Sequence, residues 1–143
     1  MSESARRLRV VPPPRARGRG RVLIADDSWD AREMYALYFR SLGYDAITAQ
    51  DGDACIESAI KAKPDVIVMD LAMPRLSGLS AAHQLKNDSR TRSIPIILLT
   101  GHGHSRIDEG AFKTGIDVFL TKPCLPEDLE GHVRRLLEES RHQ

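Results

Sequence analysis

Residues 65–74 have the sequence DVIVMDLAMP, in which an apolar run leads directly into an aspartate. Within it, residues 66–69 are an unbroken apolar run of strand length, which is typical of a strand buried on both faces of a sheet. Asp70 follows this run directly. Because open α/β sheets bind ligands in the crevice beyond the carboxyl ends of their strands, the position of Asp70 indicates a functional residue.

Three further strand-like runs end in polar residues in the same way. They cover residues 22–25, 96–99 and 118–121, and the polar residues that end or follow them are Asp26, Asp27, Thr100 and Lys122. The carboxyl ends of parallel strands meet at one edge of a sheet. The sequence therefore predicts that three carboxylates, one hydroxyl and one ammonium converge at this edge.

Strand-like and helix-like segments alternate along the chain with short connections. We expect strands at residues 21–25, 45–49, 66–69, 96–99 and 117–121, and helices at about 28–42, 53–62, 77–86, 105–113 and 126–139. Ser28 and Ser77 are suited to cap two of these helices. Five repeats of strand and helix predict an α/β fold with a parallel sheet covered by helices on both faces.

The apolar spacing within the helices predicts which faces are buried. On the first helix the expected buried residues are Ala31, Met34, Tyr35, Tyr38 and Leu42. Cys55 falls in the apolar pattern of the second helix, so we expect its thiol to lie in the core. The only other cysteine is Cys124. Two cysteines do not make a disulfide framework, so they favour a reducing compartment.

The composition fits one soluble domain with a basic tail. The chain has 143 residues, of which 41% are hydrophobic and 29% charged. Residues 1–20 hold six arginines and three prolines, so we expect a disordered arm followed by a folded domain over residues 21–140. No apolar run approaches the ~20 residues that a membrane span needs, so the sequence predicts a cytoplasmic protein.

Three converging carboxylates call for a cation. Two carboxylates about 4 Å apart repel each other by roughly 4 kcal/mol at an effective dielectric constant of about 20. Carboxylate oxygens with retained waters suit Mg²⁺, and Lys122 adds a second positive charge. This combination favours phosphoryl transfer, in which a carboxylate nucleophile gives an aspartyl phosphate.

With these polar residues at the ends of its predicted strands, the chain resembles a stand-alone receiver domain of bacterial two-component response regulators. The resemblance rests on VLIADD, VIVMDLAMP, Gly78, IPIILLTG and FLTKP, and it covers the whole chain except the arm. It implies a flavodoxin-like three-layer fold with the strand order 2-1-3-4-5. It also implies a signalling domain rather than an enzyme, with self-phosphorylation and slow self-dephosphorylation as its only chemistry.

The resemblance also implies a role for individual residues. Asp70 would be the phosphoacceptor, and the Mg²⁺ ligands would be Asp26, Asp27, Asp70 and the main-chain carbonyl of Ala72. Thr100 and Lys122 would contact the phosphoryl oxygens, Thr100 and Phe119 would form the switch, and the Lys122–Pro123 peptide bond would be cis. Ala72 and His102 stand where the family varies and tunes the phosphoryl lifetime.

The resemblance implies partners as well. The phosphoryl group would come from a sensor histidine kinase or a histidine phosphotransfer protein. A downstream protein would bind the face formed by the fourth helix, the fifth strand and the fifth helix. We expect no DNA-binding domain and no membrane span, and dimerisation upon phosphorylation is left open.

Two other interpretations remain open at this point. One is a Mg²⁺-dependent phosphohydrolase similar to the haloacid dehalogenase superfamily, although such enzymes usually carry an aspartate where this chain has Ala72. The other is a DNA-binding regulator that uses the basic arm, although residues 140–143 leave no room for a helix-turn-helix. The arm itself is either a solvated tail or a weak electrostatic tether to an anionic partner.

Overall fold

Strands and helices alternate in the computed structural model, which describes residues 18–101 and 115–141. The strands are β1 (Arg21–Ala25), β2 (Asp45–Ala49), β3 (Val66–Asp70), β4 (Ile96–Thr100) and β5 (Val118–Thr121). The helices within the described ranges are α2 (Trp29–Ser41), α3 (Gly52–Ala62), α4 (Gly78–Lys86) and α6 (Pro126–Arg141). The helix predicted at residues 105–113 and His102 lie outside the described residues.

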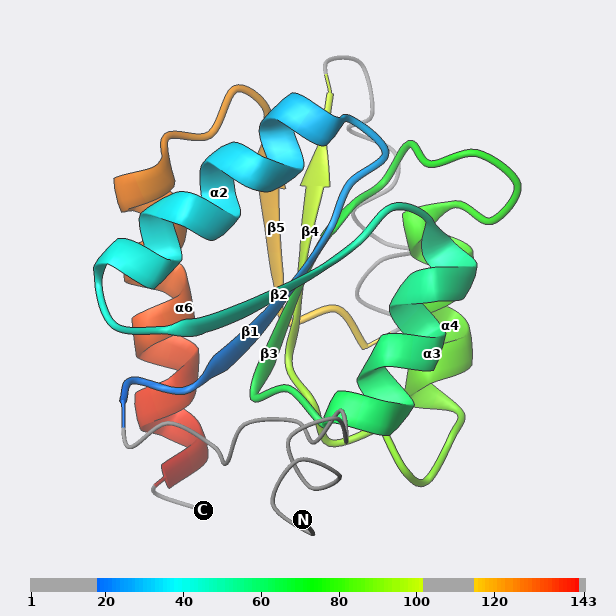
Figure 1. Ribbon diagram of the computed structural model, residues 1–143. Coiled ribbons are helices and arrows are strands. Elements are labelled where there is room, and N and C mark those ends of the chain that lie inside the picture. Colours follow the sequence, from blue (N-terminus) through cyan, green and yellow to red (C-terminus); the bar gives the residue numbers. More distant parts are fainter. Residues whose placement is uncertain (1–17, 102–114, 142–143) are drawn as a thin grey trace, which may run out of the picture.

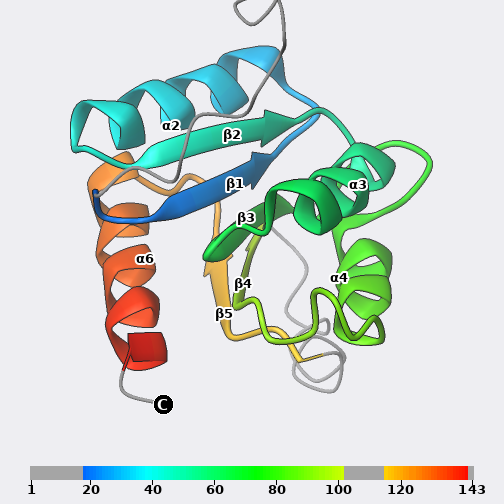
Figure 2. The same cartoon turned by 60° about the horizontal axis from the view of Figure 1, so that its bottom comes forward.

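The five strands form one parallel sheet in the order β2-β1-β3-β4-β5. Helices α2 and α6 cover one face of this sheet, and α3 and α4 cover the other (Figures 1 and 2). The predicted flavodoxin-like three-layer architecture is therefore confirmed.

The two-residue period of the strands divides the core into two clusters. In β3, Val66 and Val68 pack with α2 and α6, whereas Ile67 and Met69 pack with α3 and α4. Every residue of β3 and β4 is buried, as the unbroken apolar runs predicted. Burial of each apolar side chain in these two strands contributes about 1.5–3 kcal/mol to the stability of the fold.

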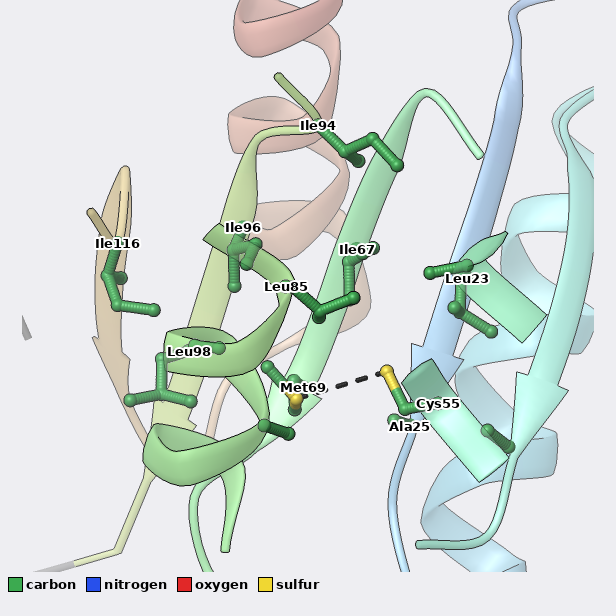
Figure 3. Close-up of a cluster of buried hydrophobic side chains, with 14 of the residues drawn as sticks. Leu23, Ala25, Cys55, Ile67, Met69, Leu85, Ile94, Ile96, Leu98 and Ile116 are labelled. Carbon is green, nitrogen blue, oxygen red and sulfur yellow. Dashed lines mark hydrogen bonds between the residues drawn. The ribbon is translucent and has the colours of Figure 1, made fainter. Parts of the chain in front are cut away.

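Cys55 belongs to the cluster between the sheet and helices α3 and α4 (Figure 3). It is fully buried, and its Sγ lies 3.9 Å from the Sδ of Met69. Burial raises the pKa of the Cys55 thiol to about 12, so the thiol stays protonated and unreactive. The prediction that Cys55 lies in the core is confirmed.

Polar caps mark where the helices begin. The side chains of Ser28 and Ser77 accept hydrogen bonds from the main-chain N–H of Ala31 and Ser80, so both predicted caps are confirmed. Helix α3 begins earlier than expected, at Gly52, because the Asp51 side chain caps it by accepting from Ala54 N at 2.8 Å. A cap of this kind contributes about 0.5–2 kcal/mol.

The buried face of α2 differs from the predicted one. Its buried residues are Tyr35, Ala36 and Phe39, whereas Met34 is 43% exposed. The prediction included Tyr35 but left out Ala36 and Phe39, so the observed buried face is rotated about the helix axis relative to the predicted one. The Phe39 ring packs edge-on against the Tyr44 ring at a centroid distance of 5.2 Å, and both residues belong to the core cluster on this face of the sheet.

Two further observations concern the N-terminal arm and the question of a membrane span. Of the predicted arm, only residues 18–20 are described, and within them Arg19 pairs with the buried Glu130 at 3.5 Å. Among the described helices, none combines the length and the apolar character that crossing a membrane requires.

Candidate functional site

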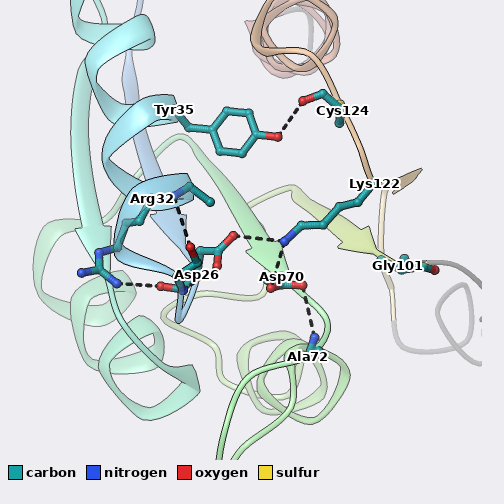
Figure 4. Close-up of polar contacts among 11 residues, drawn as sticks. Asp26, Arg32, Tyr35, Asp70, Ala72, Gly101, Lys122 and Cys124 are labelled. Atoms are coloured by element: carbon teal, nitrogen blue, oxygen red, sulfur yellow. Dashed lines mark hydrogen bonds and ion pairs between the residues drawn. The ribbon is translucent and has the colours of Figure 1, made fainter.

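The two-residue period of the strands places three charged side chains on one face of the sheet edge. Along β1, Val22 and Ile24 face α2 and α6, and Asp26 continues this alternation one step beyond the strand. Asp70 continues it after Val66 and Val68 in β3, and Lys122 after Val118 and Leu120 in β5. This is why residues nearly a hundred positions apart meet (Figure 4).

The ammonium of Lys122 lies between two carboxylates. Its Nζ is 3.3 Å from Asp26 Oδ2 and 3.1 Å from Asp70 Oδ2. One carboxylate oxygen from each of Asp26, Asp27 and Asp70 can be chosen so that the three atoms lie within 4.8 Å of one another. Asp26 and Asp70 are buried, whereas Asp27 is exposed at the mouth of the site. The structure thus brings together the carboxylates and the ammonium that the sequence predicted at this edge.

Burial and charge act against each other in this site. Burial raises the pKa of the Asp70 carboxyl above its ordinary value, and the charge of Asp26 acts in the same direction, while Lys122 opposes both. Burial would lower the pKa of the Lys122 ammonium, but its contacts with Asp70 and Asp26 outweigh this and raise it. Lys122 is therefore held in its charged form beside the two carboxylates.

The donor set fits a divalent metal ion. Three carboxylates and one ammonium leave two negative charges unbalanced. Among the described residues, Arg32 also donates to the main chain of Asp26, but its Nε pairs with Glu33 at 3.9 Å. Clustered carboxylate oxygens that are open to solvent at Asp27 match the preference of Mg²⁺ for oxygen ligands and retained waters.

The loop after β3 is fixed by main-chain contacts. Leu71 N donates to Leu99 O at 2.8 Å, and Gly78 N donates to Leu71 O at 2.8 Å. Ala72 is exposed, and its N–H donates to Asp70 Oδ1 at 3.3 Å. These bonds hold the Asp70 carboxylate at the end of its strand.

Thr100 and Phe119 lie on the other face of the sheet edge. Thr100 is 2% exposed, and its Oγ1 donates to Gly101 O at 2.9 Å. Phe119 is half-buried and packs against the cluster beneath α3 and α4, with its main chain opposite Leu98. The peptide bond between Lys122 and Pro123 is cis, the isomer that the resemblance implied.

Two residues of α2 support the site and were not predicted to do so. Arg32 Nη1 donates to the main-chain carbonyl of Asp26 at 2.8 Å, and Tyr35 OH donates to the carbonyl of Cys124 at 2.6 Å (Figure 4). The apolar spacing marked Tyr35 only as a core residue. One feature of the sequence could have pointed to both residues: they lie on the helix that begins two residues after Asp27.

The comparisons with known proteins agree with this geometry. A family model described as the response regulator receiver domain matches residues 22–134. Two solved structures with similar folds are the receiver domain of a signal transduction histidine kinase from Syntrophus aciditrophicus and the chemotaxis response regulator CheY4 of Vibrio cholerae. The first has a TM-score of 0.79 at 31% identity and covers 87% of this chain and 94% of that chain. The second has a TM-score of 0.75 at 31% identity, and its alignment covers 81% of this chain and 97% of that chain.

Curated relatives are longer than this chain. The chain is 33% identical to the DNA-binding dual master transcriptional regulator RpaA of Synechocystis over 84% of its own length. It is 30% identical to the phosphate regulon transcriptional regulatory protein PhoB of Escherichia coli over 82% of its length. These alignments cover 50% and 51% of the relatives, so the chain spans about half the length of the curated relatives it matches.

These relatives correct one prediction. The partners expected from the sequence were proteins only, with no DNA-binding domain. Both relatives are transcriptional regulators, and RpaA is named as DNA-binding. These relatives contradict the expectation of no DNA-binding domain, because they are about twice the length of this chain and are named as transcriptional regulators.

Proposed function

Because the chain belongs to the family of response regulator receiver domains, we propose that it accepts a phosphoryl group on Asp70. The observation that carries this proposal is the surroundings of the Asp70 carboxylate. It stands at the carboxyl end of β3, with Lys122 Nζ at 3.1 Å and with one carboxylate oxygen each of Asp26 and Asp27 within 4.8 Å of one of its own. This arrangement supplies a nucleophile and a positive charge at the same place.

The proposed reaction is one displacement at phosphorus. A carboxylate oxygen of Asp70 attacks the phosphoryl group of a phosphohistidine on a histidine kinase or a phosphotransfer protein. The phosphorus–nitrogen bond breaks, its electron pair stays on the imidazole, and an acyl phosphate forms on Asp70. Lys122 stabilises the negative charge on the phosphoryl oxygens, since its ammonium already lies beside the attacking carboxylate.

The acidic group would hold Mg²⁺ during this reaction. Asp26, Asp27 and Asp70 would supply carboxylate ligands, and the main-chain carbonyl of Ala72 would complete the ligands from the protein. When bound, Mg²⁺ supplies positive charge to the phosphoryl oxygens. The protein itself contributes the position of Asp70, which the bonds of Leu71 to Leu99 and of Gly78 to Leu71 hold in place.

The proposed switch lies next to this site. Thr100 would turn its hydroxyl from Gly101 O toward the phosphoryl group, which offers stronger charged acceptors. Phe119 would then change its rotamer into the space beside Thr100, since the two residues lie on adjacent strands. The change would alter the surface at β5 and so carry the signal outward.

Incorporation of acid-labile phosphate from acetyl phosphate in the presence of Mg²⁺ tests this proposal. We expect labelling of the wild type and none of Asp70→Asn, because an amide oxygen is a poor nucleophile. Asp53→Asn is the matched control, since Asp53 is an exposed carboxylate on α3 that does not belong to the group of Asp26, Asp27 and Asp70. Equal labelling of Asp70→Asn and the wild type would refute the proposal. Steady hydrolysis of a generic phosphate ester would instead favour the phosphohydrolase alternative.

A further inference from the structure

Tyr35 makes a contact that joins two distant parts of the chain. It lies on the inner face of α2 and is 4% exposed. Its hydroxyl donates to the main-chain carbonyl of Cys124 at 2.6 Å, across 89 residues of sequence (Figure 4). A buried hydroxyl needs a partner, and this one finds it in the loop between β5 and α6.

That loop follows the lysine of the site directly. Cys124 stands two residues after Lys122, and α6 starts at Pro126. Pro123 and Leu125 in the same loop are exposed, with Leu125 at 58%, and only Cys124 between them packs against the core cluster under α2 and α6. Main-chain hydrogen bonds therefore contribute to holding the loop in place.

Two such bonds flank the lysine. Lys122 N donates to Thr100 O at 2.6 Å, which ties the start of the loop to β4. The bond from Tyr35 to Cys124 ties the next part of the loop to α2. A lysine side chain has four rotatable bonds, so its ammonium stays between Asp26 and Asp70 only if its main chain is anchored.

We propose that Tyr35 is a positioning residue for the phosphoacceptor site, because its hydroxyl anchors the loop that carries Lys122. This inference rests on the proposed function, since it assigns to Tyr35 an effect on phosphorylation of Asp70. Tyr35 does not touch the phosphoryl group; it acts through the ammonium of Lys122. Arg32 supports the other side of the site in a similar way through the carbonyl of Asp26.

The expected effect falls on the rate and not on the affinity for the phosphodonor. Without the hydroxyl the loop moves more freely, and the ammonium is less often in place when charge develops on the phosphoryl oxygens. We expect Tyr35→Phe to lower the saturating rate of phosphorylation by about three- to tenfold, the range that the loss of one hydrogen bond corresponds to. The acetyl phosphate concentration that gives half the saturating rate should stay within about twofold.

The matched control comes from the same helix. Tyr38 is half-buried on α2, and its hydroxyl makes no hydrogen bond with any residue that the structure describes. Tyr38→Phe therefore removes the same atom from a place where it holds nothing. We expect Tyr38→Phe to be phosphorylated at the wild-type rate. Circular dichroism at the assay temperature shows whether each variant is folded.

A double-mutant cycle separates positioning from a general structural role. Tyr35→Phe is made in the wild type and in Lys122→Ala, with Lys122→Gln as a second background, and acetyl phosphate with Mg²⁺ is the phosphodonor. If Tyr35 acts through Lys122, its substitution slows the wild type but has no further effect in either lysine variant. An equal fold loss in all backgrounds, or no loss in the wild type, overturns the inference. Labelling of Asp70→Asn at the wild-type rate would mark a failure of the proposed function instead.

Discussion

Substituting Gly78 by alanine should damage the site through the main chain. A Cβ at this position would lie 2.3 Å from Asp70 O, 2.9 Å from Leu71 Cα and 3.0 Å from Asp70 C. All three atoms belong to the main chain at the end of β3, so no side chain can rotate away to make room. The strand end that carries the phosphoacceptor must move instead.

The expected loss combines two opposing effects. Gly to Ala at an unhindered helix position stabilises a protein by up to about 1 kcal/mol. Overpacking a tight site typically costs about 1–3 kcal/mol, and contact with main-chain atoms places Gly78 at the upper end of that range. We expect Gly78→Ala to lose about 2 kcal/mol of unfolding free energy, equivalent to a fall of about 5–10 °C in Tm.

Urea unfolding and Asp70 phosphorylation are the two assays for this variant. Gly131→Ala is the matched control, because the nearest contact of a Cβ there is Arg134 Nη2 at 3.8 Å. It should be more stable by about 0.5–1 kcal/mol and phosphorylated at the wild-type rate. Gly78→Ala should be less stable and phosphorylated more slowly. Wild-type stability together with wild-type phosphorylation of Gly78→Ala would refute this reasoning.

Three further predictions concern pH, metal binding and the phosphoryl lifetime. The hydrogen bond from Ala54 N–H, together with the Arg75 ion pair, holds the pKa of Asp51 below its ordinary value. Asp51 therefore contributes stability above about pH 4 that is lost as the pH falls through its folded-state pKa. Asp51→Asn should flatten the acid limb of a stability profile from urea unfolding, and an unchanged slope would contradict this. Trp29 is 65% exposed and stands two residues after Asp27, so its fluorescence should respond to Mg²⁺ and to beryllofluoride; a flat titration would count against its placement. Ala72 offers no polar side-chain atom to hold a water beside the acyl phosphate, so Ala72→Asn should speed loss of phosphate by about tenfold, a small part of what a well-placed acid or base supplies. Loss at the wild-type rate would show that other groups position this water.

The sequence predicted the sheet and its charged edge for a simple physical reason. Strands buried on both faces read as unbroken apolar runs, and polar residues at their ends stand out against them. The alternation in β1 and β3 then decides which of these side chains share a face. The shared edge of the strands predicted that Asp26, Asp70 and Lys122 converge, and the alternation explains why they meet on one face in the structure.

Other features could not be read from one sequence because they depend on the assembled layers. The buried face of α2 includes Phe39, and its ring partner Tyr44 lies beyond the end of the helix. The bond from Tyr35 to Cys124 joins elements that become neighbours only when α2 and α6 pack on the same face. No local sequence pattern predicts such a contact, and the apolar spacing predicted only that Tyr35 is buried.

Chemical mapping of the phosphorylated residue shows whether Asp70 is the phosphoacceptor. Borohydride reduces an aspartyl phosphate to homoserine, and mass spectrometry of peptides from the reduced protein shows which position has changed. After treatment with acetyl phosphate and Mg²⁺, we predict homoserine at position 70 and at no other aspartate. Homoserine at Asp26 or Asp27, with position 70 unchanged, would contradict the assignment of Asp70 as the phosphoacceptor.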